Sequence, residues 1–297
     1  MRVVVACDAT AGLSPRAASE AVAGAFAREG ATVAVVTLGA EGATFREALA
    51  VADPGATLAA PRDNTDLFDV LRNPRDGVVV DLTGYRADDL GRAALLGLGP
   101  DPRSAFDGLR VAWSGLRLSA VVPEGEVGRP LTGLSGLAST AGRAEGLDLS
   151  SVLAADAAAE AWAAELGVTP GPGAGAAWGA GLLFAALGAD LAHPLALLTD
   201  RFGLARTVGQ ADVVVTGAES LDFHAVGGPV VKHMVALAGE ALRPAIAVVG
   251  RNFVSSRELR LVGIESAYPA IDTAGEMPST PEQLGRVAAR VASTWRW

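Results

Sequence analysis

The start of the chain is the feature that most constrains its fold. Arg2–Cys7 is a continuous apolar, β-branched run, which is typical of a parallel strand buried on both faces. Ser14 as N-cap and Pro15 at the first helical position then predict a helix that continues to about Arg28. A second apolar run follows at residues 33–38. The opening therefore predicts a β-α-β unit with a parallel sheet.

The same alternation returns near the other end of the chain. Strands are expected at residues 212–216, 245–250 and 263–267, and helices at 230–241, near 255–261 and at 280–293. Together with the two opening strands, these segments predict one flavodoxin-like, doubly wound sheet with strand order 2-1-3-4-5. We assign residues 1–60 plus 205–297 to this first α/β domain.

Residues 61–204 are predicted to form a second α/β domain, inserted after strand two. Two domains agree with a length of 297 residues, since single cores stop growing at roughly 250–300 residues. The pattern indicates a strand at 77–82, a helix at 90–98, strand material at 111–122, an alanine-rich helix at 151–166 and a buried helix within 174–189.

Charge and cysteine content limit the classes of partner. Lys and Arg number 24 against 33 Asp and Glu, so the net charge of −9 disfavours nucleic acid and anionic membrane surfaces. The single cysteine, Cys7, permits no internal disulfide and suits a reducing compartment. The longest uncharged apolar run is about 16 residues, whereas a membrane span needs about 20. We therefore expect a cytoplasmic protein.

Three carboxylates are expected at the carboxyl ends of neighbouring strands. Asp8 follows the first strand, and Glu219 and Asp222 follow the third. Ligands of open α/β sheets collect beyond these strand ends, at the point where the strand order reverses. Such acids suit a Mg²⁺ ion or general-base work on a hydroxyl. The alternative is that each is a helix cap or a solvated loop acid.

A phosphate-binding helix start is predicted shortly after these acids. Gly227, Gly228 and Pro229 open a helix whose free N–H groups and dipole attract anions. Lys232, the only lysine, lies within the first turn and can face the same anion. Plain turn chemistry and a solvated lysine are the alternatives. The loop at 39–44 lacks the spacing of a P-loop.

Six segments resemble, in order, the motifs of the glycerate kinase family of the type with an N-terminal APDSFKGS motif. They are residues 5–14 (VACDATAGLS), 39–44 (GAEGAT), 83–91 (TGYRADDLG), 126–133 (EVGRPLTG), 173–188 (GAGAAWGAGLLFAALG) and 216–222 (TGAESLD). The resemblance implies ATP-dependent phosphorylation of glycerate or a related small hydroxy acid, with ATP and Mg²⁺ as cofactors. It also implies that the partners are a hydroxy acid and a nucleotide.

The departures from the family pattern fall on polar positions. Ala11 and Pro229 replace family lysines, and Arg129 replaces the asparagine of an NPL motif. Phosphoryl transfer depends on positive charge beside the γ-phosphate, so these losses bear directly on activity. The chain is also several tens of residues shorter than typical members. The family acids that it keeps are Asp8, Asp89 and Asp222.

The resemblance implies roles for the acids. Asp222 would orient or deprotonate the acceptor hydroxyl. Asp8 would also be catalytic, and Asp8 and Asp89 are candidate Mg²⁺ ligands. Arg86 and Arg129 could clamp a carboxylate through the planar guanidinium fork. The candidate substrate- or phosphate-binding residues are Lys232, Gly227, Gly228, Glu219, Asp88, Arg86 and Arg129.

A second hypothesis stays open beside the kinase. It is a catalytically silent relative that binds a small anion or a protein partner and keeps the glycine framework for folding alone. The sequence predicts neither the acceptor, nor the position phosphorylated, nor the oligomeric state.

Overall fold

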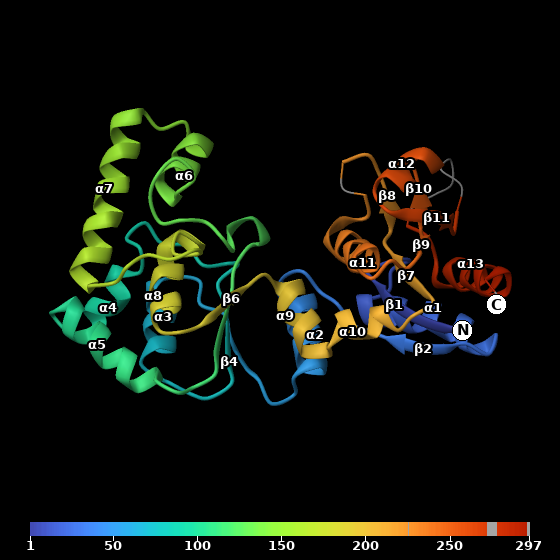
Figure 1. Cartoon of the computed structure of the whole chain (residues 1–297), viewed down its shortest axis with the longest axis horizontal. Helices are drawn as coiled ribbons and strands as arrows, with labels where there is room; N and C mark the ends of the chain where they lie inside the picture. Colours follow the sequence, from blue (N-terminus) through green and yellow to red (C-terminus); the bar gives the residue numbers. More distant parts are fainter. Residues whose placement is uncertain (225, 272–277, 296–297) are drawn as a thin grey trace. The chain divides into compact units, whose positions relative to one another are not determined.

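A computed structural model describes residues 1–224, 226–271 and 278–295. The chain divides into two compact units, Met1–Pro54 with Leu195–Trp297, and Gly55–Pro194 (Figure 1). We call them unit 1 and unit 2. Among the described residues, no helix combines the length and the apolar character that crossing a bilayer requires.

Unit 1 is built on a parallel sheet of five strands in the order β11-β9-β7-β1-β2. Numbered within the unit, this order is 2-1-3-4-5, so the predicted flavodoxin-like arrangement is confirmed. The strands are β1 (Arg2–Cys7), β2 (Thr32–Val35), β7 (Val213–Gly217), β9 (Ala245–Val249) and β11 (Ile264–Pro269). The three central strands are almost wholly buried, which explains their unbroken apolar runs.

Helices cover both faces of this sheet. α1 (Pro15–Arg28) and α13 (Pro281–Thr294) pack side by side and share one core cluster with β1, β7 and β9 (Figure 1). α11 (Gly228–Glu240) contacts the same strands but contributes nothing to that cluster, so it covers the opposite face. The other elements of unit 1 are α2 (Gly42–Ala52), α9 (Pro194–Phe202), α10 (Leu204–Gly209), α12 (Ser256–Leu261) and the short strands β8 (Ser220–Leu221) and β10 (Arg251–Asn252).

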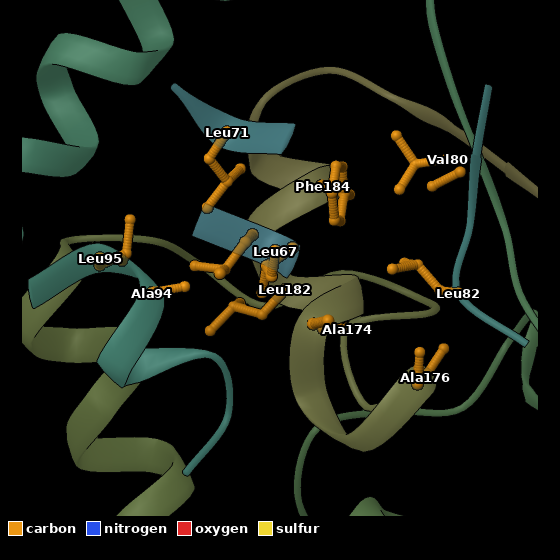
Figure 2. Packing of buried hydrophobic residues seen from close by; sticks show 14 of the residues in the cluster. Leu67, Leu71, Val80, Leu82, Ala94, Leu95, Ala174, Ala176, Leu182 and Phe184 are labelled. Carbon is orange, nitrogen blue, oxygen red and sulfur yellow. The ribbon is translucent and has the colours of Figure 1, made fainter. Parts of the chain in front are cut away.

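Unit 2 has a four-stranded parallel sheet in the order β3-β4-β5-β6. Its elements are β3 (Thr57–Ala59), α3 (Asn64–Leu71), β4 (Val78–Asp81), α4 (Arg92–Leu98), α5 (Pro102–Trp113), β5 (Leu118–Val121), α6 (Leu137–Glu145), α7 (Leu149–Leu166), α8 (Ala180–Ala186) and β6 (Asp190–Ala192), with 3₁₀ turns at Glu124–Glu126 and Ala177–Gly179. Figure 2 shows part of its core, in which Leu67 of α3, Leu95 of α4, Phe184 of α8 and Val80 of β4 belong to one cluster of buried residues. The second α/β domain inserted after strand two is thus present.

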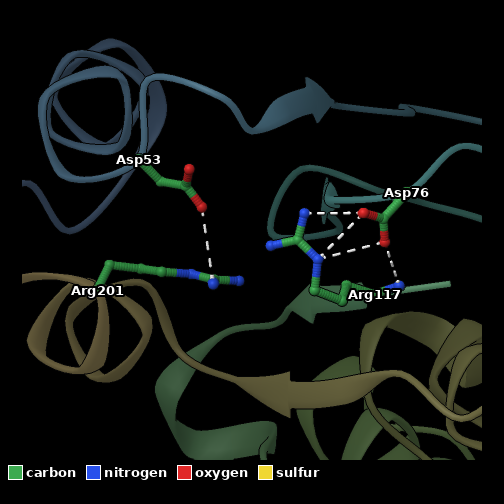
Figure 3. A network of polar contacts seen from close by, with 4 residues as sticks. All are labelled: Asp53, Asp76, Arg117 and Arg201. Atoms are coloured by element: carbon green, nitrogen blue, oxygen red, sulfur yellow. Dashed lines mark hydrogen bonds and ion pairs between the residues drawn. The ribbon is translucent and has the colours of Figure 1, made fainter.

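The unit boundaries differ from the predicted 60/61 and 204/205. β3 pairs with β4 and so belongs to unit 2. α9 belongs to unit 1, because Arg201 lies 3.6 Å from Asp53 (Figure 3). Thr199 of α9 is also hydrogen-bonded to His233 of α11 at 2.6 Å. Within unit 2 a separate ion pair, Arg117 with Asp76 at 2.8 Å, links the starts of β5 and β4 (Figure 3).

One predicted element of unit 2 was wrong in part, and another is shorter than predicted. The first part of the predicted strand material at 111–122 is the end of helix α5, and only β5 is a strand. Phe106, Leu109 and Trp113 are buried at helical spacing, and Asp101 caps the helix by accepting from Ser104 N at 3.1 Å. The predicted helix within 174–189 is reduced to α8, because Trp178 has a positive φ of 57°.

Trp113 anchors α5 and allows a test of this packing. Its side chain is buried, and its indole Nε1 donates to Leu71 O at 3.1 Å. We expect Trp113→Ala to lower the free energy of unfolding by about 3–5 kcal/mol, because it leaves a cavity and an unpaired carbonyl. Val111 is 79% exposed on the same helix, so Val111→Ala is the matched control, with a change within about 0.5 kcal/mol. Urea unfolding followed by circular dichroism measures both; equal losses in the two variants would contradict the helical assignment.

Candidate functional site

Asp8 lies where β1 ends beside β7. The register aligns Cys7 with Gly217, and Asp8 N donates to Gly217 O at 2.8 Å. Asp8 Oδ1 accepts from Ala9 N at 2.7 Å. A Cβ built on Gly228 would lie 3.7 Å from Asp8 Oδ2, so this oxygen faces the start of α11. The structure thus brings the predicted carboxylate and the predicted anion-binding helix start together.

The start of α11 is bare backbone. Gly227 and Gly228 have φ values of 82° and 84°, in the left-handed region that favours glycine. A Cβ on Gly227 would also lie 2.7 Å from Leu221 Cδ2, so this position has no space for a side chain. The first-turn N–H groups of a helix have no partner within it, and they mark the positive end of its dipole. An anion beside Gly228 would meet these groups directly.

Asp222 forms the turn that leads into this helix. It follows the short strand β8, and its Oδ1 accepts from His224 N at 2.8 Å. Its carbonyl oxygen accepts from Val226 N at 3.1 Å. The half-buried carboxyl group is therefore held in the loop between β8 and α11.

Glu219 connects two other loops of unit 1 through its carboxylate. Its Oε2 accepts from Ala11 N at 2.6 Å, and its Oε1 accepts from Ser279 N at 2.8 Å and Ser279 Oγ at 3.0 Å. Both carboxylate oxygens thus bind protein donors from two other loops. Glu219 thereby connects the loops around Asp8, and its phosphate-binding role stays a prediction.

Lys232 is exposed on α11. The buried face of the helix carries Val231, Met234 and Val235, whereas Lys232 shares the solvent face with Pro229. In the parts of the chain that the structure describes, Lys232 has no hydrogen bond or ion pair. That its ammonium group reaches back to the helix start stays a prediction.

The family acid of unit 2, Asp89, caps α4. Its Oδ1 accepts from Asn64 Nδ2 at 2.9 Å and from Gly91 N at 3.1 Å, and its Oδ2 accepts from Ala93 N at 2.8 Å. Asn64 in turn accepts from the buried Tyr85 hydroxyl at 2.7 Å. Burial, then Asp89, raises the pKa of Tyr85 above its ordinary value, so this hydroxyl stays a donor. No local pattern in the sequence pairs Asn64 with Asp89, which are 25 residues apart, so this network was not predicted.

The predicted Mg²⁺ ligands lie in different units, Asp8 in unit 1 and Asp89 in unit 2. Among residues 1–224, 226–271 and 278–295, no three His, Cys, Asp or Glu side chains gather to hold an ion. Asp89 uses both oxygens to cap a helix, and its role as a Mg²⁺ ligand stays a prediction. Asp8 remains one carboxylate of the kind that binds Mg²⁺ together with substrate phosphates.

The two candidate arginines of unit 2, Arg86 and Arg129, differ in the groups that they contact. Arg129 pairs with Glu126 at 3.0 Å, and Glu126 also accepts from Ala177 N at 2.8 Å. Arg129 thus has a carboxylate partner within unit 2, and its role as a clamp stays a prediction. Arg86 is exposed, and its guanidinium carbon lies 5.4 Å from the centre of the Trp178 ring. The described residues provide Arg86 with no carboxylate partner.

Asp88 is exposed and lines a cavity of about 460 Å³ within unit 2.

Cys7, the last residue of β1 in unit 1, is buried. Burial raises the pKa of its thiol to about 12, so at neutral pH Cys7 is a protonated, apolar core residue.

Comparisons with known proteins agree with the motifs. The model of the glycerate kinase family matches residues 106–296, which include the segments at 126–133, 173–188 and 216–222. Uncharacterised proteins of Mycobacterium bovis and Mycobacterium tuberculosis are each 29% identical over 233 residues, covering 75% of this chain and 59% of theirs. The chain thus spans less than two thirds of the length of these curated relatives.

The fold has a solved counterpart. A protein of Salmonella typhimurium LT2 assigned as glycerate kinase 2 matches with a TM-score of 0.64 and 18% identity, covering 99% of this chain and 98% of that one. This likeness concerns the fold, whereas the family model covers well over half of the sequence. This chain belongs to the glycerate kinase family.

Proposed function

We propose that this protein is an ATP-dependent phosphotransferase that phosphorylates glycerate or a related small hydroxy acid. The observation that carries the proposal is the pairing of Asp8 with the bare start of α11, because a Cβ on Gly228 would lie 3.7 Å from Asp8 Oδ2. A carboxylate and an anion-binding helix start are complementary parts of a site for a metal-bound phosphate.

The residues of unit 1 would divide the work as follows. The first-turn amides of α11 bind phosphate oxygens and stabilise the charge that spreads over them during transfer. Asp222, held in the loop before α11, accepts the proton of the acceptor hydroxyl or orients it. Mg²⁺, when bound, would neutralise phosphate charge, and Asp8 is the residue that would hold it.

A silent, anion-binding relative is the second candidate, and two observations favour it. Ala11, at a family lysine position, is buried with its amide bound to Glu219. Arg129 is paired with Glu126. An ADP-release screen of hydroxy acids with ATP and Mg²⁺ separates the candidates, since only a kinase produces ADP in an acceptor-dependent way.

Asp222 is the first residue to test. We expect Asp222→Asn to reduce kcat by roughly 10²–10⁴-fold, because the amide keeps the Oδ1 acceptor for His224 N but cannot take a proton. The melting temperature should stay nearly unchanged for the same reason. Glu240→Gln, an exposed acid at the other end of α11, is the control and should keep full activity. Equal turnover in Asp222→Asn and the parent protein would remove Asp222 from the mechanism.

Lys232 is the second residue to test. If its ammonium group reaches the start of α11, Lys232→Met should weaken nucleotide or inorganic phosphate binding roughly two- to fivefold, as exposed ion pairs contribute at most about 1 kcal/mol. The effect should shrink with added salt, which screens exposed charges. Isothermal titration at low and high salt measures both quantities. An unchanged phosphate affinity would leave the site without this cation and favour the silent relative.

A further inference from the structure

Unit 2 contains a cavity that the proposed reaction has not used. It has a volume of about 460 Å³ and lies among the turn before α4, the helices α6 and α7, and Trp178. This volume falls within the roughly 300–1,000 Å³ that small-molecule sites measure. All of the lining residues belong to unit 2, so the cavity is complete within one compact unit.

Small apolar side chains form most of the walls and leave the cavity open. α6 contributes Ala138 and Ala141, and α7 contributes Ala155 and Ala158. Leu147, in the loop between these two helices, lines the cavity and is 50% exposed. Removing such carbon atoms from water is favourable. The walls therefore favour a ligand with an apolar body.

The charged side chains of the lining restrict the ligand further. Arg92 is paired with Glu165 at 3.0 Å, and both oxygens of Asp89 accept hydrogen bonds from protein donors. Asp88 and Glu145 are exposed, and neither carboxylate has a hydrogen bond or an ion pair among the described residues. The lining charges with which a ligand can still pair are therefore negative.

Two carboxylates of this kind exclude one class of ligand and favour another. They repel phosphates and organic acids, and they attract an ammonium group. Arg86 lies with its guanidinium carbon 5.4 Å from the centre of the Trp178 ring, but Arg86 does not line the cavity. Because this guanidinium already lies over the Trp178 ring, an ammonium group has its partners in Asp88 and Glu145 rather than in Trp178.

We propose that this cavity binds an organic amine, in which an ammonium group is joined to an apolar body. The body would lie among the alanine and leucine side chains of α6, α7 and their connecting loop. The ammonium group would pair with the carboxylates of Asp88 and Glu145. Asp88 would then bind a cation and not the phosphate for which its place in the sequence made it a candidate. The proposal goes beyond the proposed function and does not rest on it, because no residue of unit 1 and no nucleotide takes part.

Three probes that differ in their end group test the charge of the ligand. Phenethylamine is a cation, 2-phenylethanol is neutral and 3-phenylpropionate is an anion, and each has a phenyl ring on a two-carbon chain. In isothermal titration of the full chain at low salt, we expect phenethylamine to bind roughly two- to fivefold more tightly than 2-phenylethanol, since exposed ion pairs are weak. 3-Phenylpropionate should bind more weakly than the alcohol. An acid that binds as tightly as the amine, or an amine that does not bind saturably, would overturn the proposal.

A matched pair of variants in α7 tests the location. Ala158 lines the cavity, whereas its neighbour Ala157 is exposed and lies outside the lining. Ala158→Trp should fill the cavity and weaken the binding of phenethylamine and 2-phenylethanol at least tenfold, while Ala157→Trp should change neither. Thermal melting of both variants separates weaker binding from misfolding. Phenethylamine binding that a folded Ala158→Trp variant leaves intact would place the amine elsewhere and contradict the proposal.

A second set of variants tests the two carboxylates and keeps the shape of the cavity. Asp88→Asn and Glu145→Gln should each weaken phenethylamine binding roughly two- to fivefold and leave 2-phenylethanol binding unchanged. Glu160→Gln removes an exposed acid of α7 outside the lining and should change neither affinity. An equal loss of phenethylamine binding in all three variants would show attraction by the net charge of the chain alone, and the proposed pairing would be wrong.

Discussion

The pairing of β1 with β7 is the contact on which the candidate site of unit 1 depends. This pairing aligns β1, at the start of the chain, with β7, from the last third of the chain, so that Asp8 N can donate to Gly217 O at 2.8 Å. β7 lies equally close to β9, where a Cβ on Gly217 would be 2.2 Å from Val248 O. Only glycine fits there, and the loops after three strands are consequently held at one edge of the sheet. Backbone pairing between the strands thus places the acids of these loops.

Carboxylates in both units divide into those whose two oxygens both contact protein donors and Asp8, which has one oxygen facing the start of α11. Glu219, Glu126 and Asp89 each accept backbone N–H groups, which satisfies amides that would otherwise lie unpaired near the surface. These acids stabilise the framework. Asp8 differs, because one of its oxygens faces the double glycine of α11. An acid that directly follows a strand can be predicted to lie near a site. Its role there depends on which backbone N–H groups lie close to its carboxylate.

Sequence pattern predicted the elements that have clear local signals. β1 and α1 have the predicted bounds, since a β-branched run and a Ser-Pro helix start are local features. The strand order was predicted from the doubly wound topology that the alternating strands and helices indicated. The segment 111–122 was misread because the helix of Phe106 and Trp113 ends inside an apolar stretch. The Arg129–Glu126 pair could have been found from its spacing of three residues. The Trp162 indole N–H, which has no partner among the described residues, could not be found in this way, because only the packed structure shows which N–H groups lack a partner.

The replacement of the family lysines changes how the site can attract a phosphate. Ala11 is buried with a φ of 58° and its amide on Glu219, so its loop supplies Glu219 with a donor and has no cation. The start of α11 carries only about half a unit charge from its dipole. Its amides, however, are fixed by the fold, whereas a lysine side chain loses rotamer freedom when it binds. Weaker charge is thus partly offset by preorganised donors, which act most strongly on charge that develops during a reaction. A site of this kind depends more on the backbone at Gly227 and Gly228 than on any single cationic side chain.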